Sequence, residues 1–259
     1  MKKIKVKILS NKNIKGDFFK LRLEFPFSDK IEPGQFVHIR IGESFPPLLR
    51  RPFSISNAGC GWIDIVYKVV GKGTRLLSEF KEGKKLDIIG PCGRGFSVSP
   101  LKKRYLLAGG GVGVSPLVFL SRRIMEKNKN ALVDVFLGFK KKEDVILEED
   151  FSGENLTLHI ATEDGSYGYK GVVSELVESH IKSLSSLSEV KVYACGPTDM
   201  LRVFARLCFK YKICCEVLME EIIGCGVGAC RGCVVKGKEG YMRVCQEGPA
   251  FDIKELSWE

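Results

Sequence analysis

Four cysteines near the carboxyl end of the chain have a spacing that could hold a metal centre. They follow the pattern C-x4-C-x2-C-x11-C, and the first three match the spacing with which plant-type 2Fe-2S clusters are held. A loop around such a cluster needs left-handed backbone angles and bare N–H groups aimed at sulfur, which interleaved glycines supply. The candidate ligands are Cys225, Cys230, Cys233 and Cys245, and the glycines are Gly224, Gly226, Gly228 and Gly232.

A structural zinc site is the main alternative, because four thiolates also bind zinc. Zinc ribbons usually carry two C-x2-C pairs, whereas here Cys225 stands alone and glycines outnumber polar knuckle residues. A disulfide framework is less favoured, since the ten cysteines form no even pattern of pairs. We expect the cluster, and we keep a basic zinc-ribbon binding protein as the alternative from a different class.

Length and composition limit what the cluster can be attached to. The chain has 259 residues and 44% hydrophobic content, enough for one large or two medium domains. Residues 1–8 alternate charged and aliphatic side chains, which is typical of a strand and unlike a signal peptide. Glycines, a serine and a proline interrupt the longest apolar run, at 106–120. We therefore expect a cytoplasmic protein with no membrane contact.

The formal net charge of +10 raises the question of nucleic-acid binding. The lysines are scattered along the chain and mixed with acidic residues, and no basic helix or aromatic platform accompanies them. We expect no nucleic-acid partner. Some of the excess charge could face nucleotide phosphates or an acidic partner protein.

The first hundred residues predict an antiparallel β-barrel. Alternating or β-branched runs are separated by turn residues, and a short helix is expected between Gly71 and Glu82 with Thr74 placed to cap it. The expected strands are residues 5–9, 18–25, 36–41, 63–70 and 85–89.

Two stretches of this barrel have residue types suited to a phosphate-bearing cofactor. In the extended segment 50–56, Arg51 could hold a phosphate while Ser54 and the backbone reach a flavin ring. In the segment Gly71–Lys72–Gly73–Thr74, backbone N–H groups and a helix start could meet a pyrophosphate. Each pattern taken alone is also compatible with an ordinary turn.

The middle of the chain predicts a doubly wound nucleotide-binding domain. The apolar run 105–108 leads into Gly109, Gly110, Gly111 and Gly113, and a helix opened by Pro116 follows. Pro116 stands where the Rossmann fingerprint has its third glycine. Strand-like and helix-like runs then alternate, which predicts a parallel sheet covered on both faces. The later runs are residues 132–138, 156–161, 172–179 and 190–194.

A second strand-to-helix turn, Cys195–Gly196–Pro197, ends the last of these strands. Ligands of open parallel sheets lie beyond the carboxyl ends of the strands, so this turn and the glycine run could flank one crevice. Cys195 would then face a bound dinucleotide, although simple packing of a cysteine at a strand end is the alternative.

These motifs, in this order, resemble the ferredoxin-reductase superfamily across residues 1–210. The resemblance implies an FAD-binding barrel (1–100) and an NAD-binding α/β domain (101–210). The cysteine loop and the segment 243–251 resemble a narrower family, the electron-transfer subunits of type B dihydroorotate dehydrogenase. That resemblance covers the whole chain and makes residues 211–259 a 2Fe-2S module.

The resemblance also implies roles for individual residues. The four cysteines ligate the cluster, and NADH is the implied nicotinamide, although Lys140, Lys141 and Lys142 lie where a 2′-phosphate would be met. The implied FAD contacts are Arg51, Pro52, Phe53, Ser54, Val66, Tyr67, Lys68, Gly73 and Thr74.

The expected function is electron transfer between NAD(H) and a partner flavoprotein that oxidises dihydroorotate to orotate, in a heterotetramer of two plus two chains. A flavin must stand between a two-electron nicotinamide and a one-electron cluster. We expect no catalytic acid-base residue, and we interpret His38, His159 and His180 as structural or surface residues with no shared site. The runner-up is the small subunit of another NAD(P)H:ferredoxin or sulfide oxidoreductase.

Overall fold

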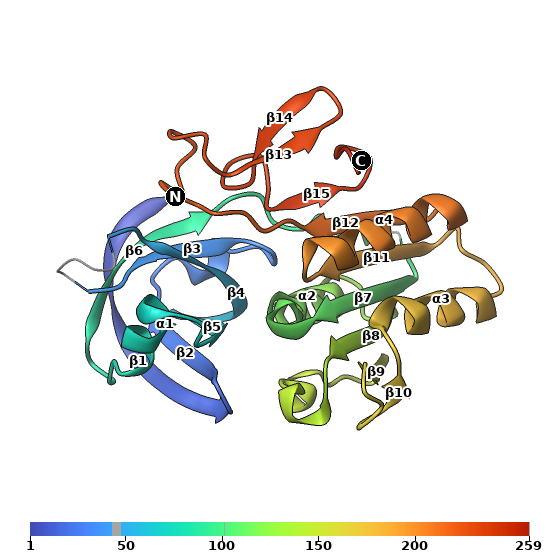
Figure 1. The fold of residues 1–259 in the computed structure, drawn as a ribbon, viewed down its shortest axis with the longest axis horizontal. Coiled ribbons are helices and arrows are strands. Elements are labelled where there is room, and N and C mark those ends of the chain that lie inside the picture. The colour runs from blue at the N-terminus through green and yellow to red at the C-terminus, as the bar shows by residue number, and fades with distance from the viewer. Residues whose placement is uncertain (43–47, 101, 259) are drawn as a thin grey trace.

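The computed structural model describes residues 1–42, 48–100 and 102–258. A closed β-barrel and a helix-covered sheet lie side by side, and the C-terminal segments cross above them (Figure 1). The three-part architecture expected from the sequence is confirmed.

The barrel has six antiparallel strands in the order β1-β2-β5-β4-β3-β6. Its core is aliphatic and aromatic because alternate residues of each strand point inward, as Val37 and Ile39 do on β3. The expected strands are present, and the segment with Arg51 forms a further one. The bounds are β1 (Lys2–Lys15), β2 (Phe18–Glu24), β3 (Phe36–Arg40), β4 (Arg51–Gly59), β5 (Trp62–Lys68) and β6 (Lys85–Cys92).

The expected short helix is α1 (Lys72–Ser78). Thr74 is its third residue and not its N-cap, which corrects the predicted capping position. Its Oγ1 accepts the N–H groups of Val70 at 2.9 Å and Gly71 at 3.2 Å, so it fixes the chain entering the helix.

The second domain is a seven-stranded sheet in the order β10-β9-β8-β7-β11-β12-β15. All neighbours pair in parallel except β15, which runs antiparallel to β12. The bounds are β7 (Arg104–Gly110), β8 (Leu132–Phe139), β9 (Leu156–Thr162), β10 (Tyr169–Lys170), β11 (Val190–Cys195), β12 (Cys214–Leu218) and β15 (Ala250–Asp252).

Helices cover both faces of this sheet, as the sequence predicted. α2 (Ser115–Lys127) packs on one face, and α3 (Val173–Ser183) and α4 (Thr198–Tyr211) pack on the other. α2 also touches the barrel, since Arg122 donates to the Asn57 side chain at 2.8 Å and Phe119 enters the barrel core. This helix therefore joins the two domains.

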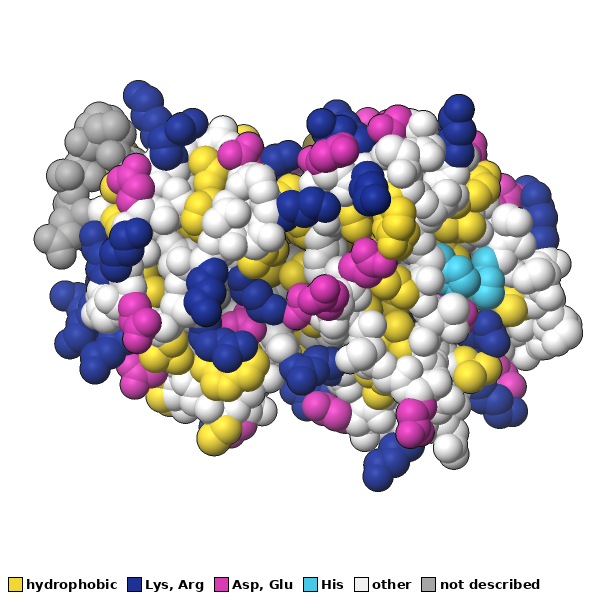
Figure 2. Space-filling view, turned by 90° about the horizontal axis from the view of Figure 1, so that it is seen from below, with side chains coloured by type: hydrophobic (Ala, Val, Ile, Leu, Met, Phe, Trp, Pro, Cys, Tyr) yellow, Lys and Arg dark blue, Asp and Glu magenta, His cyan; other side chains and the backbone are white. Residues whose placement is uncertain are grey.

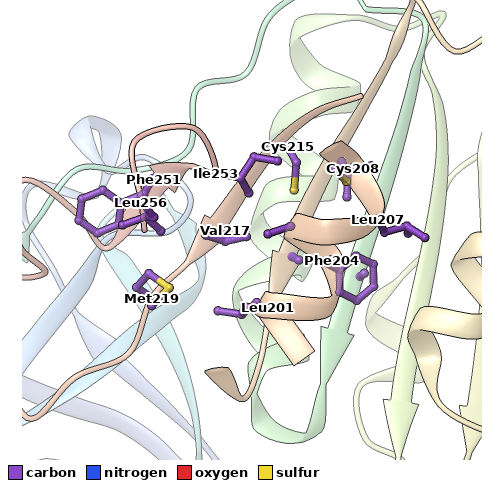
Figure 3. Packing of buried hydrophobic residues seen from close by; sticks show 14 of the residues in the cluster. Leu201, Phe204, Leu207, Cys208, Cys215, Val217, Met219, Phe251, Ile253 and Leu256 are labelled. Atoms are coloured by element: carbon purple, nitrogen blue, oxygen red, sulfur yellow. The ribbon is translucent and has the colours of Figure 1, made fainter. Parts of the chain in front are cut away.

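The sheet continues beyond residue 210, because β12 and β15 complete it on one side. Side chains of α4, β12 and the segment around β15 pack into one apolar cluster (Figure 3). The loop between β12 and β15 carries the four cysteines and the hairpin of β13 (Val234–Gly237) and β14 (Gly240–Arg243). Two sheet strands thus anchor both ends of the cysteine loop.

Basic and acidic side chains are mixed on the face seen in Figure 2. Within the described ranges, the structure has no helix long and apolar enough to cross a membrane.

Candidate functional site

A cavity of about 460 Å³ lies where all three parts of the chain meet. The barrel contributes most of the residues that the sequence singled out for a flavin. The nucleotide domain contributes Gly113, Cys195 and Gly196, and the cysteine-bearing segment contributes Ile223 and Val244. The barrel residues on the wall are Arg51, Pro52, Phe53, Ser54, Val66, Tyr67, Lys68, Gly73 and Thr74.

The two neighbouring arginines at the start of β4 take different partners. Arg50 binds Asp87 on β6, with its Nη2 2.9 Å from the carboxylate and its Nη1 2.7 Å from the backbone oxygen. Arg51 lies on the cavity wall beside Gly73 and donates to the carbonyl oxygen of Leu49, so none of its hydrogen bonds goes to a carboxylate among the described residues. The Arg51 guanidinium is therefore placed to meet an anionic ligand in the cavity.

Tyr67 combines an aromatic wall with a fixed hydroxyl group. Its ring stacks on Phe19 at 5.5 Å, meets Phe53 edge-on at 5.8 Å, and its hydroxyl donates to Asn11 at 3.1 Å. Burial raises the pKa of Tyr67 to about 12, so the hydroxyl stays protonated. The aromatic pair gives one end of the cavity a rigid apolar surface suited to a flat ring system.

The two strand-to-helix turns lie against each other at the carboxyl ends of β7 and β11. Gly109 pairs with Cys195 across these strands, and a Cβ atom at Gly113 would lie 2.7 Å from the Cys195 carbonyl oxygen. Likewise, a Cβ atom at Gly110 would lie 3.3 Å from the ring of Pro197. The glycines let the turns approach and form one crevice, as the sequence predicted.

Not every predicted residue of these turns reaches the cavity wall. Gly113, Cys195 and Gly196 line it, whereas Gly109, Gly110, Gly111 and Pro197 are not on its wall. Gly111 instead supplies the turn with a φ of +56°. Cys195 is 1% exposed and belongs to the buried core cluster, so packing holds its side chain, and burial raises the pKa of the thiol well above its usual value.

Sequence reasoning missed Glu220 and Glu221, which also line the cavity. They follow β12, directly before the cysteine loop, and no motif in the sequence marks them. Glu220 is reachable by solvent, yet the protein crowded around it raises the pKa of its carboxyl group by desolvation.

Backbone N–H groups of the cysteine loop point at sulfur. Val227 and Cys230 donate to the Cys225 Sγ at 3.5 and 3.4 Å, and Gly228 donates to the Cys245 Sγ at 3.2 Å. Gly226, Gly228 and Arg231 have φ values of +72°, +78° and +54°. This left-handed backbone with inward N–H groups suits a cluster that carries negative charge on sulfur.

The sulfur atoms form two pairs and not one tetrahedral group. The thiols of Cys225 and Cys230 are hydrogen-bonding neighbours, as are those of Cys233 and Cys245, and between the pairs Cys225 acts on Cys245 only through its charge. Among all described residues, the one set of three or more candidate ligand atoms within 4.8 Å of one another contains none of these cysteines. A single zinc ion with Zn–S bonds of about 2.3 Å needs four mutually close sulfurs. Two pairs fit a two-iron cluster better.

The two pairs differ in their surroundings. Cys230 is exposed and Cys225 half-buried, whereas Cys233 and Cys245 are buried. Burial opposes ionisation of Cys225, but the N–H groups of Cys230 and Val227 outweigh it and lower the pKa of this thiol to about 6. At Cys245 burial dominates and raises the pKa to about 12. One pair therefore faces the solvent, and the other faces the protein interior.

The buried pair, Cys233 and Cys245, packs in an apolar cluster that extends to the cavity wall. Val244 lines the cavity and precedes Cys245, and both belong to the same core cluster as Cys233, Ile223 and Phe36. Phe36 comes from the barrel and also lines the cavity. The cavity and the cysteine loop thus share one continuous apolar wall.

The three histidines do not all behave as the sequence predicted. His159 and His180 come together at the buried Asp134, with Nε2–Oδ distances of 3.7 and 3.6 Å, so the expectation of no shared site is wrong for this pair. They lie outside the cavity, and Arg104 also binds Asp134 at 2.8 Å. His38 is fully buried on β3, against the cysteine loop. Spacing in the sequence gives no signal for either arrangement, because the partners come from different strands and helices.

Three family models cover most of the chain. Residues 5–96 match the oxidoreductase FAD-binding domain, and residues 107–206 match the oxidoreductase NAD-binding domain. Residues 220–257 match the iron-sulfur cluster binding domain of dihydroorotate dehydrogenase B. The chain therefore has FAD-, NAD- and iron-sulfur-binding domains.

Relatives and solved structures agree with these matches. The dihydroorotate dehydrogenase B (NAD(+)) electron transfer subunit of Bacillus pumilus is 38% identical over 99% of both chains. That of Geobacillus kaustophilus is 41% identical over 87% of this chain and 86% of its own. A solved chain of an NADH-dependent reduced ferredoxin-NADP oxidoreductase superposes with a TM-score of 0.86 at 29% identity, over 98% of this chain and 90% of that one. This chain belongs to the family of dihydroorotate dehydrogenase B electron transfer subunits.

Proposed function

We propose that this chain carries electrons between NAD and a catalytic partner subunit that oxidises dihydroorotate to orotate. The observation that carries the proposal is the single cavity walled by the barrel, the nucleotide domain and the cysteine-bearing segment. When bound, FAD exchanges two electrons with a nicotinamide and single electrons with an iron-sulfur cluster. A cavity shared by three binding domains is suited to bringing these cofactors together.

The barrel side of the cavity is proposed to hold FAD. Arg51 would bind a phosphate through its guanidinium group, and the backbone around Gly73 and Thr74 would support the pyrophosphate. Phe53 and Tyr67 would flank the ring system. The remaining contacts proposed for FAD are Pro52, Ser54, Val66 and Lys68, all on the cavity wall.

The nucleotide-domain side is proposed to hold NAD. Gly113 on the cavity wall would meet the phosphates, and Gly109, Gly110 and Gly111 would shape the turn that carries it. Cys195 and Gly196 on the wall would border the nicotinamide end, and Pro197 would hold their turn. A flat ring would lie beside the part of the cavity wall that Cys195 and Gly196 form. The proposed functional units remain residues 1–100, 101–210 and 211–259, with β12 and β15 anchoring the last to the nucleotide sheet.

Cys225, Cys230, Cys233 and Cys245 are the proposed 2Fe-2S ligands, with one pair for each iron. The N–H groups that already point at Cys225 and Cys245 would stabilise charge on the sulfurs. The exposed pair would face outward and the buried pair would face the cavity.

An electron transfer subunit requires a catalytic partner subunit. The solvent-facing side of the cysteine loop is the proposed docking face, since single electrons must leave the chain there. We propose a heterotetramer of two plus two chains in the cytoplasm.

Cofactor analysis and reduction by NADH test this function. We expect FAD, two irons and two acid-labile sulfides per purified chain, and NADH should bleach both the flavin and the cluster absorbance. NADPH should act more slowly if NADH is the physiological donor. A colourless protein that contains stoichiometric zinc and no flavin would refute the proposal.

A second candidate function is favoured by one observation, the TM-score of 0.86 with an NADH-dependent reduced ferredoxin-NADP oxidoreductase chain. In that case the partner would belong to a ferredoxin-linked or sulfide-linked enzyme. Both functions use the same cavity and cluster, so only reconstitution with each partner separates them.

A further inference from the structure

His38 is a buried polar side chain that the proposed electron-transfer role does not use. It is 0% exposed, and neither ring nitrogen makes a hydrogen bond of acceptable geometry with any residue that the structure describes. A buried polar group without a hydrogen-bond partner destabilises the folded state. Unpaired buried polar groups are rare in native proteins, so the imidazole of His38 calls for an explanation.

The strand register places His38 between the proposed flavin site and the cysteine loop. On β3, Val37 and Ile39 point into the barrel, so the alternating His38 points outward, as Phe36 does. His38 pairs with Pro52 of the cavity wall on the neighbouring strand β4. Its backbone is therefore fixed relative to the flavin side of the cavity.

The ring of His38 lies directly against the cysteine loop. A Cβ atom at Gly226 would lie 2.5 Å from the imidazole Nδ1, and backbone groups of Arg50 in the barrel and of Cys225 and Ile223 in the loop also lie near the ring. Gly226 has a φ of +72°, so a glycine is required there both by the backbone angle and by the imidazole. Cys225 and Val227, on either side of Gly226, are the residues that organise the exposed sulfur pair.

We propose that His38 is a positioning residue that holds the cluster loop at a fixed place against the flavin-binding barrel. Its imidazole packs on Gly226 and places its two ring nitrogens beside the loop backbone at Ile223 and Cys225. The inference rests on the proposed function, because it takes this loop to hold the 2Fe-2S cluster. His38 itself lies outside both the cavity wall and the cysteine motif.

The proposal separates His38 from residues that merely fill the interface. Phe36 and Ile223 give apolar contact, which any side chain of similar volume could supply. The imidazole adds polar atoms at a buried site, so an apolar isostere should keep the packing and lose the effect. A glutamine of similar reach should keep a donor and an acceptor and restore part of it.

The experiment compares His38→Leu and His38→Gln with the wild-type chain carrying its FAD and cluster. The readouts are the rate of cluster loss to an iron chelator, the midpoint potential and the EPR spectrum of the cluster. In His38→Leu we expect cluster loss to be about tenfold faster, with a changed potential and spectrum. His38→Gln should lie between the two, and FAD content should stay constant in all three.

Two further variants keep the test decisive if His38→Leu folds poorly. In Gly226→Ala the added methyl group would push against the His38 imidazole, so this variant should also lose its cluster faster. The increase in the rate of cluster loss should be smaller when His38 is alanine as well. His180→Leu, which removes an imidazole on α3, is the matched control. Its rate of cluster loss, midpoint potential and EPR spectrum should equal those of the wild type.

Hydrogen exchange separates failure of this inference from failure of the proposed function. In the cluster-free chain, His38→Leu should speed amide exchange at Val227 and Gly228 relative to wild type. Equal exchange, or equal cluster loss and potential in the loaded chains, would overturn the role of His38. A wild-type chain that binds no cluster would overturn the proposed function, even if exchange still responds to His38.

Discussion

Arg50 and Arg51 are adjacent in the chain, yet Arg50 binds Asp87 at 2.9 Å while Arg51 lies on the wall of the cavity. Successive residues of a strand point to opposite faces, which explains the division. Of these two arginines, Arg51 is therefore the one that we propose to hold an FAD phosphate.

Replacing Arg51 with alanine should weaken FAD binding about ten- to a hundredfold, because a charge-assisted phosphate contact contributes about 1.5–3 kcal/mol. Arg50→Ala is the matched control. It removes the ion pair with Asp87 and should reduce stability more than FAD affinity. Equal losses of affinity in a fluorescence titration, or a larger loss for Arg50→Ala, would contradict the assignment.

Cys230→Ser should remove or badly destabilise the cluster and leave FAD bound, because the flavin residues lie on the barrel. Iron content, cluster absorbance and FAD content measure the two effects separately. Cys60→Ser is the control, since Cys60 is exposed and lies outside the loop. Normal iron content and electron output in Cys230→Ser would show that the ligand set is wrong.

The other cysteines should tolerate substitution by serine to different degrees, because some of them are exposed and others are buried. Cys214 is exposed like Cys60, whereas Cys92, Cys208 and Cys215 are buried. We expect serine to be neutral at the exposed positions. At the buried positions it should reduce stability, because a hydroxyl replaces a small hydrophobic group, without loss of iron.

Gly113→Ala should raise the KM for NADH by about tenfold or more, since a methyl group 2.7 Å from the Cys195 carbonyl oxygen must push the two turns apart. FAD content should not change. Gly111→Ala provides the comparison, because its Cβ atom would meet no atom within 4 Å and only the backbone angle is strained. A KM effect that is larger at Gly111 than at Gly113 would count against the shared crevice.

Local patterns in the sequence were enough to predict the barrel, the nucleotide sheet and the cysteine loop. Period-two alternation gives the barrel strands, and the apolar run before Gly109 gives β7, because each signal lies within a few residues. Part of the cavity wall followed from motifs whose residues are neighbours in sequence, such as the segment from Arg51 to Ser54.

Long-range pairing explains what the sequence could not predict. β15 has three residues and joins the sheet only by pairing with β12, across the whole cysteine loop. The meeting of Asp134, His159 and His180 depends on the register of β8 and β9 and on the docking of α3. His38 has an ordinary strand context, and its importance appears only when the loop at Gly226 is folded onto it.

A buried ion pair anchors Ser97, which lies in the chain between β6 of the barrel and β7 of the nucleotide sheet. Lys191 on β11 binds Glu216 on β12 at 2.6 Å and the Ser97 carbonyl oxygen at 2.7 Å, and Tyr193 also donates to that oxygen at 2.6 Å. Lys191→Ala leaves the Glu216 charge buried and should lower the free energy of unfolding by about 3–5 kcal/mol in urea denaturation. Lys191→Met with Glu216→Gln should cost less. A single-variant loss no larger than that of the exposed Lys103→Ala would contradict this role.

We expect this chain to transfer electrons and not to oxidise dihydroorotate itself. Such oxidation needs a base poised over a substrate carbon beside a second flavin, whereas the described cavity wall carries the residues that we propose for FAD and NAD. The direct measurement is orotate formation from dihydroorotate and NAD, first with the isolated chain and then with the catalytic partner subunit added. We predict no orotate from the isolated chain, which should still reduce an artificial acceptor with NADH, and coupled turnover once the partner is present. Orotate formed at full rate by the isolated chain would contradict the account, and failure to couple to any dihydroorotate-oxidising partner would favour the ferredoxin-linked or sulfide-linked function.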